Sequence, residues 1–314
     1  SRSATPDDPA AASVPRAGAG LALGVAAVVL GFTGLSLGST IVKSTDSPGA
    51  VVAFWRLLFG AALWHLLVAV RGARLGTRRT VDAAAWRAAT LPGVAFGINL
   101  SCFFSGIELT PVAHAEFINA LTPLVMVPLA AVRLRERVQR SVVIAGAAAL
   151  VGVALILGNA PAGGTSVPGD LLVAGGMFAW VFYLTASKLA RAHLSTAEFM
   201  AVMSTAAVVT TLPISLVVGG PAELVGLSAK GWLLVVLLAL TTGVASHGLI
   251  TWAQRRVAVG TISILQLAQP ALASLWAATL LDESVQGVQI VGMAIVLAAV
   301  GSIALRSTRN VNRS

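Results

Sequence analysis

One stretch of this sequence occurs twice. Residues 112–157 read VAHAEFINALTPLVMVPLAAVRLRERVQRSVVIAGAAALVGVALIL, and moving them forward by 147 positions places Pro123 on Pro270 and Glu136 on Glu283 without a gap. Each copy reads as an apolar helix with a proline near its middle, a short loop carrying the glutamate, and a second helix rich in Ala and Gly. The repeat predicts a duplicated chain whose functional centre lies between the two halves.

The composition indicates a membrane protein. Hydrophobic residues make up 57% of the chain and charged residues only 11%, about half the charged share of a soluble domain. Runs of roughly 20 apolar residues are long enough to cross a bilayer as helices, whereas a membrane barrel would show short alternating segments. The predicted fold class is all-α integral membrane, with ten transmembrane helices arranged as two inverted five-helix repeats. The spans are expected at residues 20–42, 49–70, 89–109, 112–132, 141–157, 170–188, 196–218, 231–253, 258–281 and 287–305.

The chain divides into two repeats and two tails. Residues 1–19 are rich in Ala, Pro and Ser and are expected to form a disordered cytoplasmic tail. The first repeat is predicted at 20–158 and the second at 159–305, followed by a short cytoplasmic tail at 306–314.

The basic residues predict the orientation. With the N-terminus in the cytoplasm, 18 of the 21 Lys and Arg residues fall in cytoplasmic segments, against Lys43 and Lys230 outside and Arg56 within a span. This asymmetry predicts that both termini are cytoplasmic, in the cell (inner) membrane. Since each repeat has an odd number of spans, the second repeat enters from the opposite side, and the repeat is inverted. The net charge of +9 is spread over helix ends rather than gathered in one soluble patch, so no nucleic-acid partner is expected.

These features resemble the EamA-type transporters of the drug/metabolite transporter superfamily. The resemblance extends over 20–305 and is sharpest from Thr122-Pro123 to Leu157 and from Gln269-Pro270 to Ala304. Arg56, within Phe54-Trp55-Arg56, matches an arginine that such proteins often carry early in the second span. Where the family often shows Trp-Gly in the first span, this chain has Gly-Phe-Thr. The resemblance implies export or exchange of small metabolites such as amino acids, or of drugs.

Four polar residues beside the repeated prolines are the first candidates for the transport pathway: Asn119, Thr122, Gln266 and Gln269. The two members of each pair are three residues apart and share a helix face. Each pair ends beside a proline, which frees a backbone carbonyl or allows the helix to bend. The alternative is that these side chains only form hydrogen bonds between helices.

Four further residues are candidates for substrate contact. Arg56 is the basic residue inside a predicted span, and its guanidinium suits a carboxylate; alternatively, it binds carbonyls or reaches outward. His247 is expected to bond substrate or to be a packed neutral histidine. Trp180 and Tyr183 are three residues apart and predict an apolar cavity wall, unless they belong to an interfacial aromatic belt.

Glu116 lies one turn inside the fourth span and is a candidate proton relay, because buried carboxyls bind protons more tightly than exposed ones. The alternative is a polar cluster at the outer rim, with His114 and Glu108, that caps a helix or pairs with Lys43. The single cysteine, Cys102, excludes the usual Cys-rich metal spacings. No metal site and no cofactor are expected.

The function predicted is secondary transport of a small molecule by alternating access, with no catalytic residues. The lipid bilayer and the small-molecule substrate are the expected partners, and the protein is expected to be a monomer or homodimer. A flippase for lipid-linked substrates is the alternative. An integral-membrane enzyme would require Glu116, His114 and His247 to converge within hydrogen-bonding distance.

Overall fold

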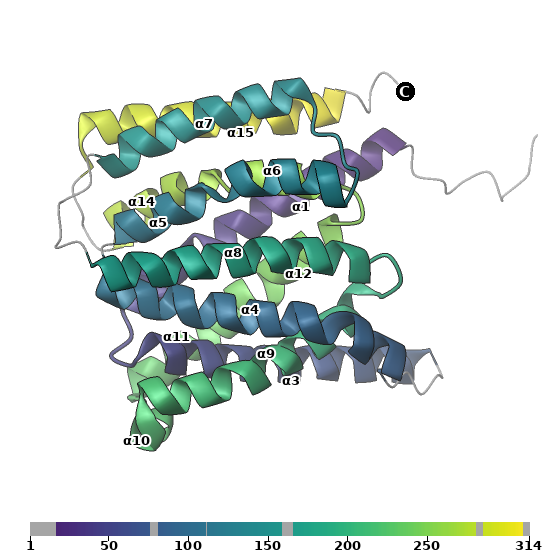
Figure 1. Cartoon of the computed structure of the whole chain (residues 1–314), viewed down its shortest axis with the longest axis vertical. Helices are drawn as coiled ribbons and strands as arrows, with labels where there is room; N and C mark the ends of the chain where they lie inside the picture. Colours follow the sequence, from purple (N-terminus) through teal and green to yellow (C-terminus); the bar gives the residue numbers. More distant parts are fainter. Residues whose placement is uncertain (1–16, 76–80, 111, 159–165, 281–284, 310–314) are drawn as a thin grey trace, which may run out of the picture.

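The computed structural model describes residues 17–75, 81–110, 112–158, 166–280 and 285–309, and all the regular structure in these ranges is helical (Figure 1). Among them, 10 helical segments are long and apolar enough to cross a membrane, as predicted. In chain order these spans are α1 with α2 (Ala17–Leu35, Leu37–Lys43), α3 (Gly49–Arg74), α4 (Ala83–Leu109), α5 with α6 (Val112–Ala120, Thr122–Arg133), α7 (Arg140–Gly158), α8 (Val167–Ala190), α9 (Thr196–Val218), α11, η2 and α12 (Ala229–Leu238, Ala239–Ser246, His247–Ala253), α13 with α14 (Val259–Leu265, Ala268–Leu280) and α15 (Gly287–Arg309). The short α10 (Gly220–Val225) joins α9 to α11.

The spans lie side by side, and the first turn of α1 and the last turn of α15 lie at the same end of the bundle (Figure 1). We call this end the terminal face and the other end the opposite face. Because successive spans alternate in direction, α5 begins at the opposite face and α13 begins at the terminal face. The two copies of the repeated stretch are therefore inverted with respect to each other.

The duplication extends beyond the stretch that is recognisable in the sequence. At the same offset of 147, the starts of α3, α5 and α7 at Gly49, Val112 and Arg140 coincide with those of α9, α13 and α15 at Thr196, Val259 and Gly287. All the spans of the first half thus have a helical counterpart in the second half. Apolar side chains in the earlier spans have diverged, but the order of the spans has been kept.

The last spans of the two repeats, α7 and α15, pack with their backbones in close approach. A Cβ atom built on Gly152 would lie 2.7 Å from the carbonyl oxygen of Gly292, and one built on Gly292 would lie 2.6 Å from that of Gly152. Both distances are too short for a real side chain. Lipid supplies no hydrophobic force between helices, so such close contact between small residues is a main source of their association.

Several helices begin or end outside the predicted spans, whereas α9 coincides with its prediction. Helix α1 starts at Ala17, within the expected tail, and α15 continues to Arg309, past the expected end at 305. Residues 1–16 and 310–314 of the predicted tails lie outside the described residues. Helix α4 starts at Ala83 because the Asp82 carboxylate accepts a 2.7 Å hydrogen bond from the backbone N–H of Ala85, which caps the helix.

The two spans with repeated prolines are each broken into two helices. Pro123 has no N–H to donate to the Asn119 carbonyl, and the Thr122 hydroxyl donates to that oxygen instead at 2.6 Å. In the second copy, the backbone N–H of Gln269 donates to the Gln266 carbonyl at 2.8 Å. Breaks at membrane depth are tolerated when their backbone groups find such partners or face a cavity. Sequence pattern indicated a bend; the structure shows two separate helices.

Candidate functional site

A cavity lies in the middle of the bundle and extends toward the opposite face. Its empty volume is about 550 Å³, which includes the open space at its mouth. It is bounded by the opposite-face halves of α1, α3 and α4, by α2, and by the end of α5 next to its break. Near the middle of the bundle it is bounded by α8, η2 and the starts of α12 and α14. The described residues that line it are Phe32, Leu35, Gly38, Ser39, Arg56, Asn99, Leu100, Phe103, Phe104, Asn119, Trp180, Thr242, His247, Gln266 and Gln269.

Six of the eight predicted substrate-contact residues line this cavity: Arg56, Asn119, Trp180, His247, Gln266 and Gln269. They come from both repeats and from spans far apart in the chain. Thr122 and Tyr183 are fully buried but are not among the lining residues. The Thr122 hydroxyl is engaged at the break between α5 and α6, and Tyr183 lies one turn closer to the terminal face than Trp180.

Arg56 is a buried cation at the cavity wall. Only 1% of its surface is exposed, and its Nε donates to the Thr242 hydroxyl at 2.7 Å. Its Nη1 has no hydrogen-bond partner among the described residues, and the guanidinium lies 5.9 Å from the centre of the Phe104 ring. A buried guanidinium without a carboxylate partner is costly, so this group favours an anionic ligand in the cavity.

An aromatic group forms the wall contributed by α8. Trp180 stacks on Tyr183 with ring centres 5.1 Å apart, and its indole Nε1 donates to the Gln266 side-chain oxygen at 3.0 Å. His247 packs edge-on against Phe96 at 4.8 Å, and its Nδ1 has no partner among the described residues. This wall is therefore mainly apolar, with a few polar atoms fixed by side chains from other spans.

Thr242 was missed by sequence reasoning. Threonine is common on apolar helices, and a search for polar residues on one face of this span assumes the period of a regular α-helix. Residues 239–246 instead form a π-helix, in which residues five apart lie over one another. Thr242 and His247, five residues apart, both line the cavity, whereas Thr251 and Gln254 are buried nearer the terminal face.

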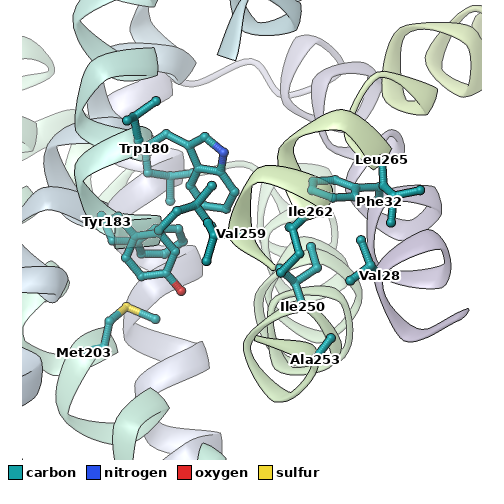
Figure 2. Close-up of a cluster of buried hydrophobic side chains, with 14 of the residues drawn as sticks. Val28, Phe32, Trp180, Tyr183, Met203, Ile250, Ala253, Val259, Ile262 and Leu265 are labelled. Carbon is teal, nitrogen blue, oxygen red and sulfur yellow. The ribbon is translucent and has the colours of Figure 1, made fainter. Parts of the chain in front are cut away.

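Packed apolar side chains separate the cavity from the terminal face. Figure 2 shows these side chains, drawn from α1, α8, α9, α12 and α13. The residues on this side of the cavity are Val28, Tyr183, Met203, Ile250, Ala253, Val259 and Ile262, all of which are almost fully buried. The cavity is consequently closed toward the terminal face in this conformation.

Polar bonds reinforce this closure close to the terminal face. Lys188 forms a 3.0 Å ion pair with Glu136 and donates to the carbonyl oxygens of Gln254 and Val257. Glu136 also accepts a 2.7 Å hydrogen bond from the backbone N–H of Val259, the first residue of α13. These bonds tie α8, α12 and α13 to the loop between α6 and α7. We call Lys188 and Glu136, together with the arginines described next, the terminal-face latch.

Arg191 and Arg255 complete the latch. Arg191 donates to the carbonyl oxygens of Thr251 and Leu194, while Arg255 donates to those of Arg191 and Leu194 at 2.6 and 2.9 Å. Burial, with a smaller contribution from the nearby Arg255, lowers the pKa of Arg191 to about 10. Arg191 therefore stays charged at neutral pH. Both arginines hold carbonyl oxygens near the ends of α8 and α12.

Glu116 is buried beside the cavity and does not line it. Its surface is 2% exposed, and its Oε1 accepts a 2.6 Å hydrogen bond from Ser39, which does line the cavity. Glu108 instead accepts a 2.7 Å hydrogen bond from the backbone N–H of Gly49, the first residue of α3. The side chain of His114 lies outside the described residues.

Comparison with known proteins shows similarity to a membrane transporter. The chain is 30% identical over 169 residues to the "Aromatic amino acid exporter YddG" of Ancylobacter novellus, a match that covers 52% of this chain and 58% of that protein. A solved crystal structure aligns with 88% of this chain and 96% of its own, with a TM-score of 0.67 and 24% sequence identity. At 24% identity, the similarity to this crystal structure is evidence for a common fold alone.

The profile of the EamA-like transporter family matches residues 17–158 and 167–305. The two matched segments cover nearly all the described residues and correspond to the two halves of the bundle. With its ten spans and its central cavity, the chain is a multi-pass membrane protein that belongs to the EamA-like transporter family.

Proposed function

We propose that this protein exports small amphipathic metabolites that carry a carboxylate and an aromatic ring, with aromatic amino acids as the first class to test. The observation that carries the proposal is the buried Arg56 guanidinium, with a free Nη1, in a cavity lined by Phe32, Phe103 and Trp180. The name of the relative, an aromatic amino acid exporter, supports the same substrate class.

In this proposal, the substrate carboxylate binds the guanidinium of Arg56, which Thr242 orients through Nε. Charge-assisted bonds of this kind are about twice as strong as neutral ones. The aromatic ring of the substrate packs against Trp180 and the phenylalanines. The amides of Gln266 and Gln269, from the second broken span, then face the polar end of the substrate from the other repeat.

Transport follows from the two broken spans. Helix α5 reaches from the first break to the opposite face, and α13 reaches from the second break to the terminal face. Inverted repeats of this kind exchange conformations around a central site. Movement of α13 would open the terminal face as α5 closes the other. If the predicted orientation holds, the present conformation faces outward.

The test uses the full chain purified in detergent and then reconstituted in liposomes. A substrate at 100 times its dissociation constant should stabilise the protein by about 2.7 kcal/mol if it binds only the folded state. Phenylalanine, tyrosine and tryptophan are compared with their amides, which lack the carboxylate. We expect stabilisation and counterflow with the acids and little with the amides. Equal effects of acids and amides, or stabilisation by lipid-linked compounds alone, would reject this function and favour the flippase.

Arg56→Gln tests the residue itself. Loss of one charged hydrogen-bonding partner should weaken binding of the acids by roughly 10- to 100-fold, or about 1.5–3 kcal/mol. The control is Arg74→Gln, which removes the same charge from an exposed position at the terminal face. Unchanged affinity in Arg56→Gln, with unchanged melting temperature, would exclude Arg56 from the site.

We also propose that Glu116 binds the proton that drives export. Its burial and its bond to Ser39, at the cavity wall, support this role. Two other carboxylates lie at the opposite-face ends of α4 and α8. Glu108 accepts a hydrogen bond from the backbone N–H of Gly49, and Asp170 accepts one from the Thr110 hydroxyl. Lys43 is the basic residue in the last turn of α2, at the same face. A carboxyl held in apolar surroundings favours its neutral form.

Glu116→Gln keeps the size and hydrogen-bonding capacity of the side chain but cannot release a proton. We expect it to abolish substrate movement driven by a pH gradient and to preserve substrate counterflow. Asp46→Asn, at an exposed position on the same face, is the control. If Glu116→Gln retains gradient-driven transport, Glu116 does not bind the driving proton, and the proposed carrier function is unaffected.

A further inference from the structure

A second hollow lies at the terminal face, between α1, α7, α13 and α15. Its empty volume is about 660 Å³, including the space at its mouth. The described residues that line it are Leu21, Val25, Arg137, Gln139, Ser141, Val142, Val257, Ala258, Thr261, Ile303 and Arg306. No acidic side chain is among these lining residues. We call this hollow the basic groove.

Two arginines supply its charge. Arg137 and Arg306 are exposed, come from different repeats, and form no ion pair or hydrogen bond with the described residues, unlike Arg191 and Arg255 nearby. The adjacent carboxylate of Glu136 is already bonded to Lys188 and to the N–H of Val259. With respect to the described residues, the two guanidiniums are therefore unneutralised and available to an anion from outside the chain.

The other lining residues have two chemistries that suit a lipid. Gln139, Ser141 and Thr261 offer neutral hydrogen-bonding groups beside the arginines, whereas Leu21, Val25 and Val142 offer apolar surface from helices that continue into the membrane. A soluble anion would use the first set and leave the second exposed to water. A phospholipid has a charged phosphate, a polar glycerol ester region and acyl chains, in that order, and matches both.

We propose that the basic groove binds the headgroup of an anionic phospholipid, with the phosphate between Arg137 and Arg306 and the start of an acyl chain against α1 and α7. The groove lies at the ends of the spans, which is the depth of lipid headgroups. Basic pockets between spans on the cytoplasmic side are suited to anionic headgroups. The proposal depends on the predicted orientation and is independent of the transported substrate.

A bound lipid would also brace the closed terminal face. Val257 and Ala258 line the groove, and the next residue is Val259, whose N–H is held by Glu136. The Val257 carbonyl accepts a hydrogen bond from Lys188 at 3.2 Å on the other side of the same segment. A headgroup in the groove thus contacts the segment that must move when α13 opens.

The test measures retained lipid on the full chain by native mass spectrometry after exchange into mixed micelles. Phosphatidylglycerol is compared with phosphatidylcholine of the same acyl chains. Arg137→Gln combined with Arg306→Gln removes both guanidiniums, and Arg71→Gln combined with Arg74→Gln is the control, because it removes two exposed charges from the terminal-face end of α3. Melting temperatures establish that both double variants are folded.

We expect the wild type and the control to prefer phosphatidylglycerol, and the groove variant to lose about tenfold or more of that preference. Equal loss in both double variants would indicate diffuse attraction by the whole basic face and would overturn the proposal. So would retention of the preference in the groove variant. Full displacement of the lipid by millimolar inorganic phosphate would identify a site for a soluble anion instead.

Discussion

Lys188 on α8 and Glu136 in the loop after α6 form a 3.0 Å ion pair that joins the two repeats at the terminal face. At the offset of 147, the position equivalent to Lys188 in the first repeat is Ile41, and the position equivalent to Arg191 is Ser44. The latch therefore has no cationic equivalent at these positions on the opposite face. This difference gives a physical reason why the terminal face is the closed one.

Removing the charge of Lys188 from the terminal-face latch should open the terminal face. Lys188→Met keeps the aliphatic length but loses the ion pair and two carbonyl contacts, while Glu136 remains partly buried. We expect the closed state to lose about 1.4 kcal/mol, or a factor of ten in population, between the values typical of exposed and buried pairs. The measurement is the rate of maleimide labelling of Ala253→Cys in a Cys102→Ala background.

The matched control for the latch is Lys230→Met, since Lys230 approaches Asp46 to 4.0 Å at the opposite face and both are exposed. Labelling at position 253 should be unchanged in this variant. If both lysine variants raise labelling equally, or if Lys188→Met does not raise it at all, the latch does not control the terminal face.

Thr242 should contribute to substrate affinity through Arg56. Thr242→Val removes the acceptor of the Arg56 Nε hydrogen bond, so the guanidinium loses its orientation but keeps its charge. We expect binding of a carboxylate substrate to weaken about tenfold, at the lower end for a charged hydrogen bond, as measured by titration calorimetry. Thr242→Ser keeps the hydroxyl and should bind like the wild type. Similar losses in both variants would assign the effect to packing rather than to this bond.

Thr122 should stabilise the break between α5 and α6 rather than contact substrate. Thr122→Val leaves the Asn119 carbonyl without the hydroxyl that replaces its helical partner. An unsatisfied buried acceptor costs about 1–3 kcal/mol, so the melting temperature should fall, and Thr122→Ser should restore it. A lower substrate affinity at unchanged melting temperature would instead indicate that Thr122 contacts the substrate.

Gly152 should be intolerant of any side chain. A Cβ at this position would meet the Gly292 carbonyl at 2.7 Å, so Gly152→Ala forces α7 and α15 apart and should cost about 1–3 kcal/mol of stability. Gly301→Ala is the control on α15, where a Cβ meets nothing within 4 Å and helix propensity favours alanine. Thermal unfolding in detergent that ranks the two variants equally would contradict the close approach of these helices.

Several features of the fold could be predicted from patterns in the sequence. Apolar runs identify spans because the bilayer requires a minimum helix length, and the repeat at Pro123 and Pro270 identifies the duplication. Inversion follows from the odd number of spans in each repeat. The helix ends were less well predicted, since α1 and α15 extend past the apolar runs that mark the membrane core.

The candidate site could be predicted only in part from the sequence. Polar residues beside the prolines reach the cavity because the breaks lie there, and Arg56 was recognisable as an arginine inside a span. Thr242 was hidden, because the π-helix changes the period that a pattern search assumes. Thr122 was assigned to the pathway by its spacing, although its hydroxyl is bonded to the backbone at the break.

The ten spans, the two inverted repeats and the family features can be recognised in the sequence, because they depend on local hydropathy, on the odd number of spans per repeat and on the repetition of residues along the chain. Only the folded chain shows that Arg56 contacts Thr242, that Trp180 contacts Gln266, and that Lys188 and Glu136 pair at the closed terminal face. Those pairings join residues far apart in sequence, and they depend on how each helix is rotated and broken when it packs against its neighbours.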